Sequence, residues 1–126
     1  MKHKLITDLI LKAFFEVYNE LGGGFLESVY ENALLIALKE RGLQVEQQKP
    51  IQVYFRGNQV GEFRADLVVN NAVVVELKAT KAIDQSHIAQ LMNYLKATDI
   101  EVGLLLNFGE KPEFKRLVYD NKRKHR

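Results

Sequence analysis

The chain contains no cysteine, and this absence excludes several kinds of chemistry at once. Disulfide bonds, thiolate metal sites and a cysteine nucleophile are all ruled out. A cytoplasmic setting fits a chain of this kind, so we expect the protein to be cytoplasmic. No apolar run approaches the roughly 18 residues that indicate a membrane span. An amphipathic pattern, and not a signal sequence, follows the basic N-terminus.

The chain also lacks a strong charge of either sign. It has 18 Lys and Arg against 16 Asp and Glu, a net charge of +2 that does not demand a polyanionic partner. The charge is uneven, because a basic tail, residues 120–126, closes the chain. Such a tail is either a solvated end or a guide for a phosphate backbone, and both alternatives stay open. With 126 residues, 47% of them apolar, we expect one globular domain over 1–126.

Two helices are predicted in the first third of the chain. Apolar residues recur at helical spacing from Leu5 to Leu21, and three glycines, 22–24, end that pattern. The second helix is expected from about Phe25 to Arg41, with Glu27 bordering its buried face. Its predicted core-facing residues are Leu26, Val29, Tyr30, Ala33, Leu34 and Ala37.

Strand patterns then take over. Residues 43–49 alternate weakly before Pro50, which indicates an edge or a break. Strands are expected at 51–56 and 59–63, around a turn at Gly57-Asn58, and then as a hairpin over 66–78. A helix from Asp84 to about Ala97 follows, then a buried strand at 101–108. Residues 114–119 are either a last strand, which we favour, or a short helix. The order α-α-β-β-β-β-α-β, with a last possible strand, predicts an α/β fold of helices on a central mixed sheet.

The hairpin carries charges where burial is expected. Asp66, Glu76 and Lys78 sit in runs of valine and leucine, and a buried carboxylate needs a cation, a metal or several donors. A two-residue turn at Asn70-Asn71 would point Asp66 away from Glu76. A three-residue turn, or one bulge, would place it opposite Glu76 on the face that Lys78 shares. We predict the second arrangement, because only then do the charges compensate one another.

Two converging carboxylates with a lysine suit a hard cation such as Mg²⁺. Asp66 and Glu76 would be ligands, with a backbone carbonyl near Leu77, and Glu27 would add a third carboxylate. The ion would lower the pKa of a bound water and offset charge on a phosphate, while Lys78 would orient the nucleophile or stabilise the transition state. The alternative is that these are ordinary charges on an exposed edge strand.

The segment Gly24-Phe-Leu-Glu-Ser-Val-Tyr resembles the motif of the GxxExxY proteins, a branch of the PD-(D/E)XK nuclease superfamily. The resemblance runs from about residue 5 to residue 118. Two departures occur: Ala65 stands where the proline of the "PD" pair would be, and three glycines replace Gly-Pro-Gly before the helix. Further blocks that resemble the family in order are Gln48-Lys-Pro-Ile, Ala65-Asp-Leu, Val75-Glu-Leu-Lys-Ala, Ala89-Gln-Leu-Met-Asn-Tyr-Leu and Leu105-Leu-Asn-Phe-Gly.

The resemblance implies a restriction-endonuclease-like αβββαβ core, here with an extra N-terminal helix. It also implies a catalytic set of Glu27, Asp66, Glu76 and Lys78. The three carboxylates of that set would be the metal ligands, for Mg²⁺ or for Mn²⁺ as a substitute.

A second set of residues is expected beside the catalytic one. Gln90 and Tyr94 resemble the Gln-x-x-x-Tyr helix motif of the recombination-repair nuclease branch, which lies next to the active site. Tyr30 is either a core residue or one whose hydroxyl reaches a site carboxylate. His87, one turn before Gln90, is either near the cleft or solvated.

The leading hypothesis is a Mg²⁺-dependent nuclease that hydrolyses DNA phosphodiester bonds. The alternatives are a non-catalytic nucleic-acid-binding or assembly protein on the same scaffold and an RNA-processing nuclease. A domain this small has little room for a separate sequence-reading module. It would therefore recognise structure or ends, act as a homodimer, or rely on a partner protein. Arg64, Lys81 and the basic tail are candidates for guiding a phosphate backbone.

Overall fold

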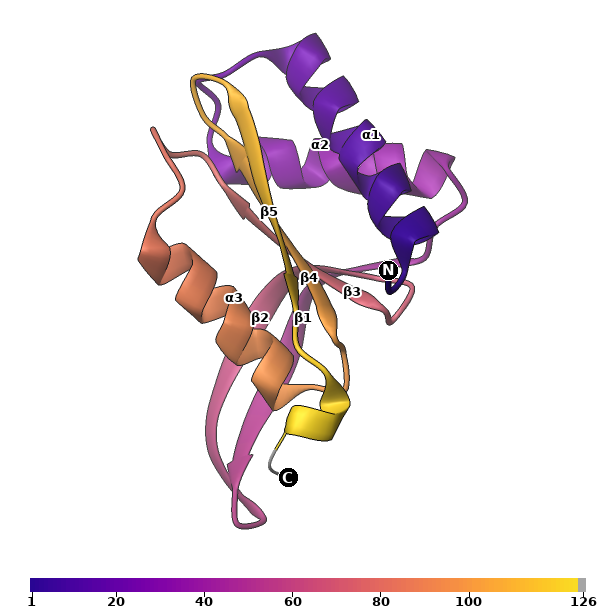
Figure 1. Ribbon diagram of the computed structural model, residues 1–126. Coiled ribbons are helices and arrows are strands. Elements are labelled where there is room, and N and C mark those ends of the chain that lie inside the picture. The colour runs from indigo at the N-terminus through magenta and orange to yellow at the C-terminus, as the bar shows by residue number, and fades with distance from the viewer. Residues whose placement is uncertain (125–126) are drawn as a thin grey trace.

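A five-stranded sheet occupies the centre of the computed structural model, which describes residues 1–124 (Figure 1). The strands lie in the order β1-β2-β3-β4-β5. Only β3 and β4 are parallel; the other neighbours are antiparallel. The sheet is therefore mixed, as predicted. Its strands are β1 (Val45–Phe55), β2 (Asn58–Val69), β3 (Val73–Lys78), β4 (Val102–Phe108) and β5 (Pro112–Val118).

Helices cover both faces of the sheet. The first two, α1 (Lys4–Leu21) and α2 (Glu27–Glu40), pack on one face, and α3 (Gln85–Ala97) packs on the other (Figure 1). Helix α3 forms the crossover that parallel strands β3 and β4 require. It begins with a capping box, in which the Asp84 carboxylate accepts a hydrogen bond from Ser86 N and His87 Nδ1 accepts one from Asp84 N. The predicted α/β fold with an added N-terminal helix is confirmed.

Strands β3 and β4 are almost completely buried between these helix layers. Burial of each large apolar side chain contributes about 1.5–3 kcal/mol, so this two-sided core is the main source of stability. The layer under α1 and α2 includes Phe14, Tyr30, Leu34 and Phe108, and the layer under α3 includes Val68, Val74, Leu91, Leu95 and Leu105.

The predicted number of strands before α3 was wrong. Three strands precede α3, because 43–49 and 51–56 are parts of one strand, and 59–63 is continuous with the first strand of the hairpin. Pro50 does not interrupt β1. It pairs with Arg64 on β2. Because β1 is an edge strand, its outer side has no neighbouring strand, so the absence of an N–H on that side costs no hydrogen bond of the sheet.

The predicted buried face of α2 was partly wrong. Leu26 and Val29 are 78% and 37% exposed, whereas Leu38 is fully buried. The reason is the start of the helix: α2 begins at Glu27 and Leu26 is its N-cap, so Leu26 precedes the helix and Val29 lies in its first turn, which is exposed. Burial begins one turn later, at Tyr30.

The β1–β2 hairpin changes faces halfway along its length. In β1, Val45 packs towards α1 and α2 but Ile51 packs towards α3, although both are odd-numbered. Gln48 lies between them with a left-handed φ of 52°, which breaks the alternation. In β2, Leu67 and Ala65 also pack on different sides, so the change falls at the residue between them.

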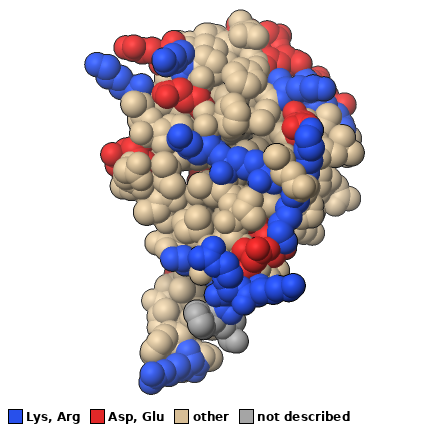
Figure 2. Space-filling model, viewed as in Figure 1, with Lys and Arg blue, Asp and Glu red and all other residues tan. Residues whose placement is uncertain are grey.

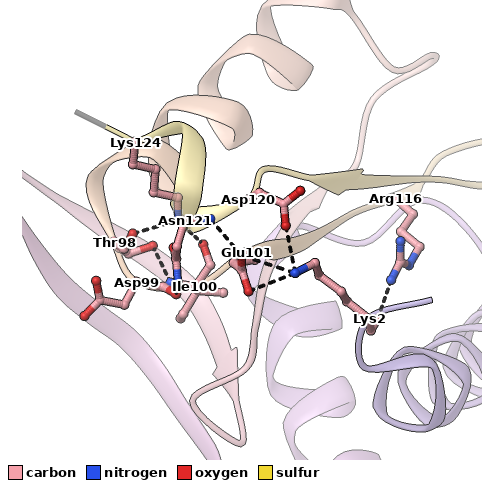
Figure 3. Close-up of polar contacts among 9 residues, drawn as sticks. All are labelled: Lys2, Thr98, Asp99, Ile100, Glu101, Arg116, Asp120, Asn121 and Lys124. Carbon is pink, nitrogen blue, oxygen red and sulfur yellow. Dashed lines mark hydrogen bonds and ion pairs between the residues drawn. The ribbon is translucent and has the colours of Figure 1, made fainter. Parts of the chain in front are cut away.

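The two ends of the chain meet in a polar cluster, here called the terminal cluster: Lys2, Glu101, Asp120 and Asn121 (Figure 3). Lys2 Nζ lies 2.7 Å from Asp120 Oδ1 and 3.3 Å from Glu101 Oε1, and Asn121 N donates to Glu101 Oε2 at 2.7 Å. The basic tail is thus folded as far as Lys124, whose Nζ donates to two backbone carbonyls before β4. Residues 125 and 126 of that tail lie outside the described residues. Among the residues described, none of the helices is both long and apolar enough to span a membrane.

Candidate active site

The turn between β2 and β3 has the register that the predicted site requires. Val69 pairs with Val73, which leaves the three residues Asn70–Ala72 in the turn. The two asparagines take left-handed φ values of 51° and 52°, which their side chains tolerate better than most. Continuing the same register places Asp66 opposite Glu76. The predicted register, with Asp66 opposite Glu76, is therefore confirmed, and of the two ways to reach it the chain uses the three-residue turn.

Asp66 sits where β2 and β3 begin to separate. The described pairing of the two strands ends one residue after it, and its Oδ2 accepts a hydrogen bond from Leu77 N at 2.9 Å. A side chain thus occupies the place where a strand carbonyl would otherwise bind this amide. Its other oxygen, Oδ1, accepts from Gln48 Nε2 at 3.2 Å. Asp66 and Glu76 together are called the carboxylate fork below.

Glu76 is the more deeply buried member of the fork, at 6% exposure, and its Oε1 has no hydrogen-bond partner in residues 1–124. Burial raises the pKa of Glu76 to about 10. A hydrogen bond to the Asp66 carboxylate and the negative charge of Asp66 raise the pKa further, and the charge of Lys78 lowers it. In the chain alone Glu76 therefore keeps its proton at neutral pH.

Lys78 ends β3 on the same face as Glu76 and is half-buried. Its ammonium group makes no hydrogen bond or ion pair within residues 1–124, so it is available to a ligand at the fork. The chain just after it is held firmly. Thr80 N donates to Asn107 Oδ1 and Asn107 Nδ2 donates to Thr80 O, both at 3.0 Å.

Asn107 was not among the predicted site residues, although it is fully buried. The signal that marks it in the sequence is a single amide inside the apolar run of β4. Gly109 belongs to the same support, because a Cβ at that position would lie 2.3 Å from Thr80 O. The segment after Lys78 can approach β4 this closely only if residue 109 is glycine.

A second acidic residue of α2 connects directly to the fork. Glu31 Oε1 accepts from Gln48 Nε2 at 2.9 Å, and that same nitrogen donates to Asp66. Glu31 Oε2 accepts from Gln47 Nε2 at 2.6 Å. Burial raises the pKa of Glu31, the hydrogen bond from Gln47 lowers it, and the charge of Asp66 raises it. Glu31 was missed from the sequence; its one signal is that it lies four residues after Glu27, on the same side of the helix.

Glu27 itself is not brought into the fork. It is exposed at the first position of α2, and its charge acts on Glu31. In residues 1–124 no group of three or more His, Cys, Asp or Glu side chains is arranged to hold a metal ion. A role for Glu27 as a third metal ligand therefore stays a prediction.

Tyr30 lies in the core and fixes the glycine loop before α2. Its ring stacks on Phe108 with centroids 4.3 Å apart, and its hydroxyl donates to Gly22 O at 2.6 Å and accepts from Phe25 N at 3.2 Å. Of the two alternatives, the structure thus places Tyr30 in core packing, with its hydroxyl on the backbone and not on a carboxylate.

Tyr94 borders the fork from α3, and Gln90 does not share its environment. Burial raises the pKa of Tyr94 to about 12, and the charges of Glu76 and Asp66 add to the rise. Its ring stacks on Phe63 at 3.8 Å. Gln90, one turn earlier, is exposed, and its side chain makes no hydrogen bond within residues 1–124. His87 is engaged in the capping box of α3.

The donors at the fork fit a divalent metal ion of the hard, oxygen-binding kind. Asp66 and Glu76 oppose each other on adjacent strands, and Glu76 has a buried oxygen without a partner. A cation there would replace the proton that burial and Asp66 otherwise keep on Glu76. The geometry thus offers two carboxylates and a nearby lysine at one point on the sheet.

Comparison with known proteins supports this view of the fold. A family model described as the PD-(D/E)XK nuclease superfamily matches residues 4–117. A solved structure titled "Crystal structure of SSO0001" superposes with a TM-score of 0.60 at 19% identity, over 75% of this chain and 50% of that one. The chain thus spans about half the length of that protein, and the likeness concerns the fold. A search among curated proteins gave no match.

Proposed function

The chain belongs to the PD-(D/E)XK nuclease superfamily and has its restriction-endonuclease-like fold, and from this premise we propose that it is a divalent-metal-dependent nuclease that hydrolyses phosphodiester bonds in DNA. One observation carries the proposal: a buried glutamate with an unpartnered oxygen lies opposite an aspartate and beside a lysine. A folded chain keeps such an arrangement at a cost, so it favours a function that supplies the missing cation. The segment from Gly24 to Tyr30 further supports the GxxExxY branch.

The two residues of the fork and the neighbouring Lys78 each have a proposed role that follows from their surroundings. Asp66 is held by Gln48 at one carboxylate oxygen and by Leu77 N at the other, and each oxygen has a second lone pair that could bind a metal ion. Glu76 would supply the second carboxylate after losing its proton. A bound Mg²⁺ or Mn²⁺ would lower the pKa of a coordinated water and offset charge on the phosphate. Lys78 would hold the nucleophile or stabilise the charge that develops on phosphorus oxygens.

The supporting residues act on these three. Glu31 fixes Gln48, and through it the orientation of Asp66. Asn107 holds the backbone after Lys78. We retain Glu27 as a proposed third ligand that would reach the ion through a water, because Mg²⁺ usually keeps several waters in its shell.

A non-catalytic nucleic-acid-binding protein on the same scaffold is the second candidate. The observation that favours it is the exposed position of Glu27, which leaves residues 1–124 without a group of three ligating side chains. The two candidates differ in one property, since only the first needs turnover.

The test is a cleavage assay on single-stranded DNA, duplex DNA and RNA with Mg²⁺, with Mn²⁺ and with chelator. We expect cleavage of DNA that requires the metal and that falls at least about 100-fold in Lys78→Ala, the size of effect seen when one transition-state charge partner is removed. Lys39→Ala, an exposed lysine in the last turn of α2, is the matched control and should keep full activity.

Undiminished cleavage by Lys78→Ala would mean a contaminating nuclease or a different site. Binding without cleavage in every metal would support the second candidate, and preferential cleavage of RNA would assign the same chemistry to RNA processing. Size-exclusion chromatography of the active sample would test the homodimer.

A further inference from the structure

The α3 side of the sheet carries a groove to which the proposed function assigns no role. It lies between the outer half of the β1–β2 hairpin and the C-terminal half of α3, and it has a volume of about 1180 Å³. Sites for single small ligands occupy about 300–1,000 Å³, so this groove is large enough for part of a polymer. It is lined by Gln52, Val53, Tyr54, Phe55, Arg56, Gly57, Phe63, Asn93, Tyr94, Lys96, Ala97, Thr98 and Asp99.

Aromatic rings are concentrated along the hairpin side of the groove. Tyr54 and Phe55 are 59% and 58% exposed near the hairpin tip, where no helix covers them. Further in, Phe63 is half-buried and stacks on Tyr94. Large rings left in solvent at a groove are the usual platform on which nucleic-acid-binding proteins stack bases.

The charges in the groove complement a phosphate backbone. Arg56 lies 4.8 Å from the Phe55 ring centroid, next to the open end, and Lys96 lines the α3 side. Asp99 is the one acidic residue among the lining residues. Figure 2 shows basic side chains at the tip of the hairpin, at the lower end of the view, and on the neighbouring surface.

The groove and the fork are connected through strand β2. Tyr94 lines the groove and stacks on Phe63 within it, and Phe63 precedes Asp66 of the fork by three residues on that strand. A strand whose phosphate lies at the fork would therefore lead directly past Tyr94 and along the aromatic side of the hairpin.

We propose that this groove binds unpaired nucleotides of the strand whose phosphate lies at the carboxylate fork, with bases stacked on Tyr54 and Phe55. The proposal rests on the proposed nuclease function and narrows its substrate to single strands or unpaired ends. An unpaired base exposes its face to a side-chain ring, whereas a base inside a duplex is covered by its neighbours. The basic side chains at the rim would then follow the phosphates.

Binding is tested directly with a fluorescein-labelled single-stranded DNA and the same sequence as a duplex, in chelator so that no hydrolysis occurs. We expect the wild-type protein to prefer the single strand. The variants Phe55→Ala and Tyr54→Ala should each weaken that binding roughly fivefold or more, the effect of losing one base–aromatic stack. Both rings are exposed, and circular dichroism of each variant checks the fold.

Phe114→Ala is the matched control, because Phe114 is 41% exposed on β5, at the opposite edge of the sheet. It should bind single-stranded DNA like the wild type. Arg56→Gln and Lys96→Gln should each reduce the dependence of log affinity on log salt by about 0.7, the value for one phosphate contact on a single strand.

The outcomes separate this inference from the proposed function. If single-strand binding depends on Tyr54 and Phe55 but the protein cleaves no substrate, the proposed role of the groove is supported and the nuclease proposal is wrong. If the protein cleaves DNA with metal but neither ring variant weakens single-strand binding, only the proposed role of the groove is wrong. Preference for the duplex, or no binding of either DNA, would also overturn the groove and would leave it to a peptide or another apolar partner.

Discussion

The terminal cluster and the carboxylate fork both contain acidic side chains, but the surroundings favour the charged form of the acids in the first and the neutral form of Glu76 in the second. In the terminal cluster, hydrogen bonds with Asp120 and Glu101 raise the pKa of Lys2. The backbone N–H of Asn121 lowers the pKa of Glu101, and Lys2 lowers that of Asp120. Lys2, Glu101 and Asp120 are each held in their charged form. In the fork, burial and Asp66 raise the pKa of Glu76 to about 10, which favours loss of its charge.

The difference shows which cluster is complete within the chain. The acids of the terminal cluster have a lysine and a backbone amide as partners, and the cluster ties the two ends of the chain together (Figure 3). The fork has two acids, and the charge of Lys78 lowers the pKa of Glu76 by less than burial and Asp66 raise it. A buried acid pair whose charge the chain does not balance would favour a bound cation, in line with the proposed function.

The largest difference between the two clusters is expected in the cleavage rate, when one acid of each is neutralised by mutation. Asp66→Asn keeps an oxygen for Leu77 N but removes a ligand charge, and we expect cleavage to fall at least about 100-fold because the metal supplies several kcal/mol of transition-state stabilisation. Asp120→Asn, in the terminal cluster, should leave the rate unchanged. Initial rates at saturating Mg²⁺ measure both. Equal losses in the two variants would erase the contrast.

The second contrast concerns stability in the absence of metal. Because the folded pKa of Glu76 lies near 10 and the ordinary value is 4.5, the unfolded chain releases this proton at a lower pH than the folded chain. The free energy of unfolding should therefore fall as pH rises from about 4.5 to 10.

Replacing Glu76 removes that cost. Glu76→Gln should raise the free energy of unfolding near pH 8 by about 2 kcal/mol or more, since one pKa unit is worth about 1.4 kcal/mol. It should also remove most of the decline with pH. Glu101→Gln should not be stabilising. Urea denaturation at several pH values, with chelator present, measures the two variants; a destabilised Glu76→Gln would show that the buried carboxyl is not under strain.

Adding a divalent cation should stabilise the fork and not the terminal cluster. At 100 times its dissociation constant, Mg²⁺ or Mn²⁺ should add about 2.7 kcal/mol to the free energy of unfolding. The affinity should increase with pH, because the ion displaces the Glu76 proton. Thermal unfolding should show the shift in the wild type and in Glu101→Gln, and show none in Glu76→Gln. A shift retained in Glu76→Gln would place the ion elsewhere.

A smaller effect is expected from the residue that positions Asp66. Glu31→Gln and Gln48→Ala should each lower the cleavage rate about tenfold, a typical cost of losing support for a metal ligand. Because the two residues act through one shared contact, the double variant should be little worse than either single one. Glu46→Gln, in the exposed ion pair with Lys49, is the control. If the losses in cleavage rate add up in the double variant, Glu31 and Gln48 act independently, and Glu31 does not position Asp66 through Gln48.

The smallest effect should come from the terminal cluster itself. Its members are at the surface, where ion pairs contribute little and salt screens them. Because the pKa values of Glu101 and Asp120 are lowered, their contribution is present at neutral pH and is lost as the pH falls below the ordinary values of those carboxyls. Lys2→Met should remove that acid-sensitive part of the melting temperature, and high salt should mimic the variant. A large loss at neutral pH would show a greater structural role.

The sequence was sufficient to predict the fork register because a local rule decides it. Asp66 and Glu76 belong to one hairpin, so the length of its turn determines whether they face each other. The capped start of α3 at Asp84 is local in the same sense. The restriction-endonuclease-like fold followed from a resemblance that spans the whole order of elements, and the family match over residues 4–117 supports it.

The parts that were missed depend on contacts between distant segments. Glu31 reaches Asp66 only through Gln48, whose left-handed backbone directs its amide to both, and no pattern within α2 indicates that contact. The exposure of Leu26 depends on where α2 meets the sheet. The passage of β1 through Pro50 depends on β1 being an edge strand, which is a property of the sheet order.

The hydrogen bond from Leu77 N to Asp66 Oδ2 has a consequence for spectroscopy. Most strand amides bond to carbonyl oxygens whose charge never changes, but this amide bonds to a titratable group at the candidate active site. Its proton chemical shift and its rate of hydrogen–deuterium exchange should change when the Asp66 carboxylate binds an ion. Leu77 is thus a native, label-free reporter in the backbone for events at the fork.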